Sequence, residues 1–240
     1  MHVDFEPPGI IEKWARDGGH VLDGTLTSTN KDLPNAADID FLIVLGGPQS
    51  PLRMNDYPYL RDEINLISTM IRQNKPIIGF CLGSQLIAEA LGARTRKSPH
   101  KEVGGFAVQL TEDGRKDPVF KDFPPEFEVI QWHHDMPGIP DGATLLARSA
   151  GCPHQAFRFG DRVYGFEFHL EPTRESIKPL LENGVGDLEP SEHTQSSEKI
   201  LSFDFETMNR RMTNVLDTIV NISSQGRNSD RPHPIGRYSQ

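Results

Sequence analysis

The sequence predicts an α/β fold with three layers, in which a mostly parallel central sheet lies between two layers of helices. Residues 41–45 and 76–80 are short, continuous apolar runs, as expected of strands that are buried on both faces. Each run is followed by a segment with apolar residues at helical spacing, and this alternation is typical of parallel sheets covered by helices. A chain of 240 residues is long enough for one such domain.

Three helices are expected in the first half of the chain. Pro8 suits the first turn of the first helix, and Gly18-Gly19 ends it. Gly92 suits the C-terminal cap of the third helix. The helices are expected at residues 8–16, 59–72 and 82–91.

From Val103 onward the pattern becomes rich in strands, which Gly, Pro and Asp turns separate. The expected strands are 105–110, 128–132, 144–149, 155–159 and 163–169. A polar stretch at 184–199 reads as loop, and an amphipathic helix is expected at 205–222. The chain is therefore divided into a domain at 1–185, an extension at 186–222 whose helix packs on that domain, and a mobile tail at 223–240.

Composition excludes several classes of protein. The chain has 25 Lys and Arg against 34 Asp and Glu, a net charge of −9, which argues against nucleic-acid binding. Its two cysteines are too few for a disulfide scaffold. No apolar run approaches a membrane span, and the first residues lack the features of a signal peptide. We expect a cytoplasmic protein without membrane contact.

The most informative segment is Gly79-Phe80-Cys81-Leu82-Gly83, between a predicted strand and a predicted helix. It has the form G-x-C-x-G, the thiol counterpart of the nucleophile elbow G-x-S-x-G. The two glycines permit a sharp turn, and the start of the helix favours a thiolate. Free cysteines are more often inert core residues. The paired glycines nevertheless favour Cys81 as a nucleophile.

A cysteine nucleophile requires a base and a group that orients the base. His169 and Glu171 are two residues apart on a predicted extended segment that Pro172 ends, so their side chains share a face. Glu171 can fix the imidazole tautomer, as the acid does in other triads. One histidine among nine beside one acid is weak alone, and the pattern gains its weight from Cys81.

A third motif, Gly46-Gly47-Pro48, follows the strand at 41–45. A glycine-rich turn at the carboxyl end of a parallel strand lies at the sheet edge where ligands bind in such folds. Its backbone N–H groups can donate to a developing oxyanion, together with the N–H of Leu82. A phosphate loop is disfavoured because no Lys-Ser or Lys-Thr follows the glycines.

Together these motifs resemble class I, triad-type glutamine amidotransferase domains, and among them the GMP-synthase-like group. The similarity covers Val3 to Thr173, including the stretches 131–135 and 155–157. The resemblance implies a flavodoxin-like α/β fold of the class I glutamine amidotransferase type, and no cofactor or metal.

The resemblance also implies a role for each matching residue. Cys81 would attack the carboxamide carbon of glutamine and form a thioester, which releases ammonia. His169 would be the general acid and base, and Glu171 would orient it. The backbone N–H groups of Gly47 and Leu82 would form the oxyanion hole.

The same resemblance places the amino-acid end of glutamine. Gln85, one helical turn beyond the cysteine, would hold that end, aided by the backbone near Trp132 and His133. The sequence 133–135, His-His-Asp, also suggests a metal site, but no other ligands at metal spacing accompany it. Cys152 has no partner motif and is expected to be an ordinary thiol.

The chain departs from the family pattern at several positions. Leu170 and Pro172 flank the glutamate where Pro and Val are usual, and Ser84 stands where His or Met is commoner. The first apolar strand of the family is reduced to residues 1–3, so that strand is either very short or truncated at its start. Nothing after Thr173 resembles an ATP-pyrophosphatase synthetase.

Three functions remain open from the sequence. The chain can be a glutaminase that supplies ammonia to a separate synthetase, in nucleotide biosynthesis or another pathway. It can instead be a stand-alone γ-glutamyl hydrolase with the same triad. A non-catalytic binding protein of the same fold is the third reading, and the intact triad argues against it. The oligomeric state is not determined by these patterns.

Overall fold

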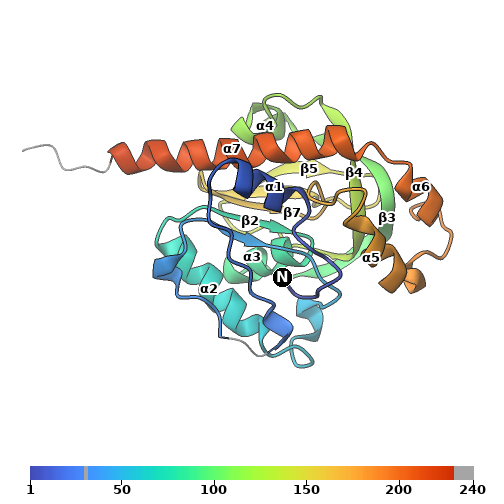
Figure 1. The fold of residues 1–240 in the computed structure, drawn as a ribbon, viewed down its shortest axis with the longest axis horizontal. Coiled ribbons are helices and arrows are strands. Elements are labelled where there is room, and N and C mark those ends of the chain that lie inside the picture. Colours follow the sequence, from blue (N-terminus) through green and yellow to red (C-terminus); the bar gives the residue numbers. More distant parts are fainter. Residues whose placement is uncertain (30–31, 230–240) are drawn as a thin grey trace, which may run out of the picture.

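The computed structural model describes residues 1–29 and 32–229 as an α/β fold around one seven-stranded sheet (Figure 1). The spatial order of the strands is β1-β2-β7-β6-β5-β3-β4. The strands are β1 (Leu42–Val44), β2 (Ile77–Phe80), β3 (Arg96–Leu110), β4 (Glu126–Met136), β5 (Thr144–Arg148), β6 (Ala156–Phe159) and β7 (Val163–Phe166).

The sheet is mixed, so the prediction of a mostly parallel sheet is wrong. β1, β2 and β7 are parallel neighbours, and Leu42 pairs with Ile77 as the two apolar runs predicted. All the other pairings are antiparallel. The reason is the length of the connections: turns of a few residues, as between β6 and β7, can join only antiparallel strands, whereas a parallel pair needs a crossover.

Helices cover both faces of the sheet (Figure 1). On one side, α2 and α3 pack on β1 and β2 around Leu60, Ile67 and Leu86, which are fully buried. On the other side, α1 contacts α7, and the indole of Trp14 donates to Asp217 at 2.7 Å. The helices are α1 (Ile10–Asp17), α2 (Leu60–Arg72), α3 (Leu82–Ala90), α4 (Glu112–Lys116), α5 (Ile177–Asn183), α6 (Ser197–Leu201) and α7 (Phe205–Ser229).

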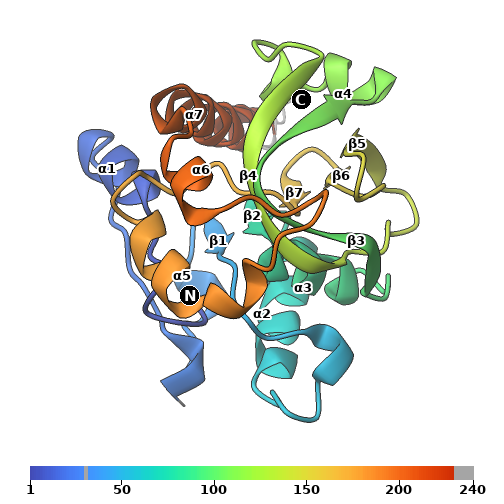
Figure 2. The ribbon, with the colours of Figure 1, turned by 90° about the vertical axis from the view of Figure 1, so that its right-hand side faces the viewer.

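Strands β3 and β4 form a long curved arm (Figure 2). β3 begins nine residues before the predicted strand and ends at Leu110 as predicted, whereas β4 is longer than predicted at both ends. The arm carries the stretch 131–135 towards the carboxyl ends of β2 and β7, where Ile130 and His169 form a bridge. This bridge brings β4 beside the segment that follows β7.

The last helix, α7, is longer than expected and ends at Ser229 instead of residue 222. Its apolar side, including Met212, Leu216 and Ile219, is buried in the same core as the sheet. Residues 230–240 of the expected tail lie outside the described part of the chain. None of the described helices combines the length and apolar character needed to cross a bilayer.

The first prediction concerns Gly83, at the contact between α3 and β1. A Cβ built on Gly83 would overlap the backbone oxygen of Val44, and backbone cannot rotate away as a side chain can. Gly83→Ala should lower the free energy of unfolding by about 3 kcal/mol because it forces the helix off the sheet. Urea denaturation measures this change.

Gly24→Ala is the matched control. A Cβ on Gly24 meets nothing within 4 Å, so this variant should change the free energy of unfolding by less than about 0.5 kcal/mol. Equal midpoints for the two variants would contradict the close approach of α3 to β1.

Candidate active site

Cys81 occupies the turn between β2 and α3, and its backbone has the unusual angles φ 48° and ψ −112°. Its N–H donates to the Phe166 carbonyl of β7 at 2.8 Å. A Cβ built on Gly79 would lie 2.5 Å from the backbone carbon of Gly83, so the helix crosses directly over the strand. The sharp turn predicted from the paired glycines is therefore present.

The thiol of Cys81 is nearly enclosed, with 8% of the residue exposed. Its Sγ lies 3.5 Å from the Trp132 carbonyl, to which the S–H donates. Burial raises the pKa of the thiol well above its usual range, and the nearby carboxylates Glu167 and Glu6 raise it further. The Leu82 amide at the helix start opposes this shift but is outweighed. The helix start therefore favours the thiolate, as expected, but burial has the larger effect on the pKa of the thiol.

His169 and Glu171 form a buried hydrogen-bonded pair. The Nδ1–H of His169 donates to Glu171 Oε1 at 2.5 Å, and the Leu170 amide donates to Glu171 Oε2 at 3.0 Å. Burial by itself lowers the pKa of His169, but the charge and hydrogen bond of Glu171 outweigh it, and the pKa is raised overall. The backbone N–H of His169 donates to the Ile130 carbonyl at 2.8 Å, which holds the backbone of His169 beside β4.

The surroundings of Gly46 show how close Cys81 and His169 lie to each other. A Cβ built on Gly46 would be 3.0 Å from His169 Cε1 and 3.6 Å from Cys81 Cβ. The same point is 2.7 Å from Glu6 Oε2, so the side chains of Glu6, Cys81 and His169 surround this glycine. A side chain at Gly46 would occupy the space between them.

The peptide between Gly46 and Gly47 is held from outside the loop. His2 Nδ1 lies 2.9 Å from the Gly46 oxygen, and His2 Nε2 lies 3.0 Å from Glu63 Oε2. Since the C=O and N–H of a trans peptide point in opposite directions, this contact turns the Gly47 N–H away from His2.

The structure distributes the three predicted substrate-binding residues around the cysteine. Gln85 is 3% exposed and donates through Nε2 to Glu167 Oε1 at 2.9 Å. Trp132 presents its carbonyl to the thiol, while its indole N–H donates to Asp187 Oδ2 at 2.9 Å. His133 directs its ring nitrogens to Glu102 and to the Asp135 carbonyl, so its ring is already occupied by partners within the protein.

Neighbouring histidines of the 133–135 stretch have separate partners. His134 Nε2 pairs with Asp187 at 2.8 Å, whereas His133 pairs with Glu102 at 3.1 Å. Within residues 1–29 and 32–229, no group of three or more His, Cys, Asp or Glu side chains is arranged to hold a metal ion.

Three acidic residues near the site were not predicted. Glu167 had a signal, since the alternation that places His169 and Glu171 on one face places Glu167 there too. Glu6 and Asp187 had none, because they reach the site from segments distant in the sequence.

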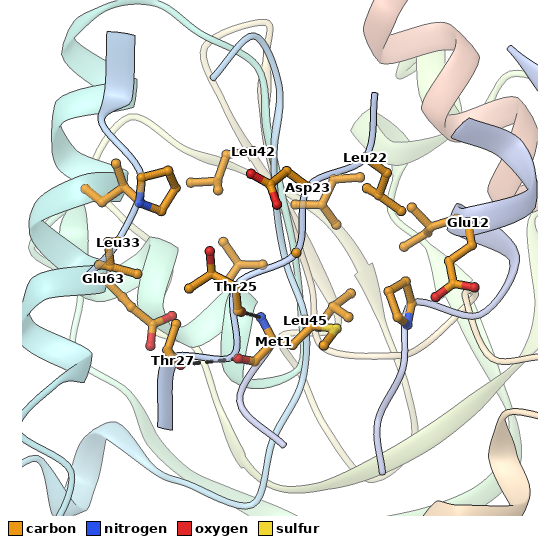
Figure 3. Close-up of a pocket in the computed structure, with 17 residues that line it drawn as sticks. Met1, Glu12, Leu22, Asp23, Thr25, Thr27, Leu33, Leu42, Leu45 and Glu63 are labelled. Atoms are coloured by element: carbon orange, nitrogen blue, oxygen red, sulfur yellow. Dashed lines mark hydrogen bonds between the residues drawn. The ribbon is translucent and has the colours of Figure 1, made fainter. Parts of the chain in front are cut away.

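A cavity of about 310 Å³ lies elsewhere, along the outer edge of β1 (Figure 3). It opens between residues 22–27 and 42–45, and its lining includes Glu63 but none of the three candidate catalytic residues. No strand forms at residues 1–3, although the Met1 carbonyl accepts from the Thr27 N–H at 3.0 Å.

A cysteine at a strand-to-helix turn, beside a histidine held by a carboxylate, defines a site able to transfer acyl groups through a covalent thioester. A family comparison gives this class a name. Residues 21–186 match the model for "Glutamine amidotransferase class-I", and the chain belongs to that family.

Relatives agree with this assignment. The chain is 38% identical over 232 residues to a glutamine amidotransferase-like protein, YfeJ, of Salmonella typhimurium, covering 94% of this chain and 97% of that protein. A glutamine amidotransferase of Thermotoga maritima has a similar crystal structure, with a TM-score of 0.83 and 26% identity over 92% of this chain and 95% of that one.

The relation to GMP synthase is more distant. The glutamine-hydrolysing GMP synthase of Thermosipho africanus is 32% identical over 179 residues, which cover 73% of this chain but 33% of that enzyme. The expected resemblance to class I glutamine amidotransferases is therefore confirmed, and the GMP-synthase-like part rests on partial coverage.

The second prediction concerns the reactivity of the two thiols. Because its pKa is raised, Cys81 should react with iodoacetamide more slowly than free cysteine at neutral pH, and faster as the pH rises. Cys152 is completely buried, at 0% exposed against 8% for Cys81, and burial also raises its pKa to about 12, so it should stay unlabelled. Mass spectrometry of the labelled peptides measures both rates.

Cys81→Ala should abolish this labelling and Cys152→Ala should leave it unchanged. Faster labelling of Cys152 than of Cys81 would contradict the environments described above.

Proposed function

We propose that this chain hydrolyses the side-chain amide of glutamine through a thioester on Cys81 and releases ammonia. The observation that carries the proposal is the position of the His169–Glu171 pair beside the cysteine at the elbow. Membership of the class I glutamine amidotransferase family supplies the substrate class.

In the proposed reaction, His169 takes the proton of the Cys81 thiol as the sulfur attacks the amide carbon of glutamine. The imidazolium then gives this proton to the leaving nitrogen, and ammonia departs. Water, deprotonated by His169, attacks the thioester and releases glutamate. Glu171 holds Nδ1 of the ring and stabilises the cation that forms in each half of the cycle.

The oxyanion of each tetrahedral intermediate is proposed to lie between the N–H groups of Gly47 and Leu82. Leu82 is the first residue of α3, where backbone N–H groups lack partners within the helix. The contact between His2 and the Gly46 carbonyl supports this role, because it sets the direction of the Gly47 N–H. Donors of this kind act where the negative charge develops.

Gln85 and the backbone near Trp132 and His133 are proposed to bind the amino-acid end of glutamine. Gln85 lies one helical turn beyond Cys81, and its amide is fixed through Glu167. Trp132 is held by Asp187 while its carbonyl faces the thiol. Gln85 and Trp132 are thus held in place on either side of the sulfur, which suits a short, flexible substrate such as glutamine.

The ammonia is proposed to pass to a separate synthetase of a GMP-synthase-like system in the cytoplasm. The similarity to one third of a GMP synthase supports a partner that supplies the remaining activity. Hydrolysis of a γ-glutamyl compound without an acceptor is the alternative, which the same triad can perform. Ammonia release from glutamine and from γ-glutamyl peptides, with and without candidate synthetases, separates the two.

The third prediction tests the nucleophile. Cys81→Ala should lower the turnover of glutamine by at least about 10⁴-fold, because the covalent route is lost with the sulfur. Cys152→Ala is a matched control, since Cys152 is also a buried free cysteine but lies outside the site, and it should retain turnover. An assay of ammonia release measures both, and equal losses would show that the assignment is wrong.

The fourth prediction concerns Gln85. Gln85→Ala should raise the KM for glutamine by about tenfold or more, the equivalent of one lost hydrogen bond to a charged group. Cys81 should still react with iodoacetamide, which shows that the elbow is intact. Gln109→Ala, at a residue that bonds Glu126 at the protein surface, is the control. An unchanged KM would place Gln85 outside the substrate site.

A further inference from the structure

Glu167 is a buried acid that the proposed chemistry does not use. The residue is completely buried between β7 and His169. Its Oε2 lies 2.7 Å from Ser84 Oγ, and its Oε1 accepts from Gln85 Nε2 at 2.9 Å. Within the described parts of the chain, no salt bridge to Lys, Arg or His involves Glu167. An ionised carboxylate in such surroundings would be costly.

The two contacts of the Ser84 hydroxyl indicate whether Glu167 carries a proton. Ser84 Oγ lies 2.8 Å from the Cys81 carbonyl and 2.7 Å from Glu167 Oε2, but a hydroxyl has one proton. The carbonyl can only accept. Both contacts are two-centre hydrogen bonds only when Ser84 donates to Cys81 and Glu167 donates to Ser84, which requires a protonated carboxyl.

Two histidines and two thiols lie close enough to Glu167 to interact with its charge. His133 on β4 and His169 favour its ionised form, as do the hydrogen bonds of Ser84 and Gln85. Burial outweighs them and raises the pKa of Glu167. The thiols of Cys81 and Cys152 also lie within its field, and a charge on Glu167 raises the pKa of both. Electrostatics and proton counting thus agree.

We propose that Glu167 is a positioning residue that carries a proton at neutral pH, so that its neutral carboxyl holds Ser84 and Gln85 without adding a negative charge beside Cys81. Its effect on turnover rests on the proposed function, whereas its protonation does not. A negative Glu167 would oppose formation of the thiolate and leave Ser84 with an unmatched contact.

The raised pKa of Glu167 makes the stability of the folded protein depend on pH. Since the folded protein binds this proton more tightly than the unfolded chain does, the free energy of unfolding falls as the pH rises above the ordinary range of glutamate. The fall continues until Glu167 itself ionises. Turnover should decline through that same ionisation, because the charge appears next to the nucleophile.

The fifth prediction uses infrared spectroscopy of the full chain at neutral pH. Glu167→Gln keeps the shape of the neutral acid, with an amide NH₂ in place of the O–H, and should remove one carbonyl-stretch band of a protonated carboxylic acid. Ser84→Ala should shift that band, because it removes the acceptor. Glu128→Gln, the same substitution at an exposed position on β4, should leave the band in place.

Turnover supplies the second readout. The ratio of kcat/KM at alkaline pH to kcat/KM at neutral pH should rise by about threefold or more in Glu167→Gln, and stay unchanged in Glu128→Gln. Absence of a Glu167 band at neutral pH would overturn the proposal, as would an unchanged ratio in an active Glu167→Gln variant. If the wild type does not hydrolyse glutamine, the proposed function fails, while the infrared band still decides the protonation of Glu167.

Discussion

The turn at Cys81 is the constraint on which the rest of the site depends. A non-glycine residue at φ 48° and ψ −112° costs of order 1–3 kcal/mol, which the surroundings must offset. They do so through the hydrogen bond from Cys81 to Phe166 and through the close approach of Gly79 to Gly83. The strained turn lifts the sulfur out of the sheet and directs the start of α3 towards it. The positions of Ser84 and Gln85 follow from this single arrangement.

Glu167 and Glu171 lie on one face of the segment that follows β7, but their surroundings differ. Glu171 has the imidazole of His169 and a backbone N–H as partners, which suits a carboxylate that orients a ring. Glu167 has a hydroxyl and an amide, which are neutral groups. Both carboxyls are buried, so their different hydrogen-bond partners suit them to the separate roles proposed above, in the way that paired acids in other active sites are distinguished by environment. A further ionised group beside Cys81 would work against the nucleophile.

Local patterns were sufficient to predict the candidate triad, because the elbow and the alternation around His169 are both short-range. The same runs predicted the parallel pairing of β1 with β2. They could not predict the direction of the later strands, which depends on connections rather than on apolar content. The start of β3, residues 96–102, carries mainly charged and polar residues, so its pairing with β4 left no pattern to read. Glu6 reaches Gly46 only through tertiary folding.

The extension after residue 185, together with Gly184 just before it, contacts the β3–β4 arm at several points. Asp187 accepts from the indole of Trp132 and pairs with His134, and Gly184 lies so close to the Trp132 ring that a Cβ there would overlap it. Gln195 bonds both the N–H and the carbonyl of Gly105 on β3, at 2.9 Å and 2.6 Å. Because these hydrogen bonds hold both strands of the β3–β4 arm, the extension helps to fix the position of Trp132, whose carbonyl faces the thiol. The family match ends at residue 186, so part of the support for Trp132 comes from outside the matched region.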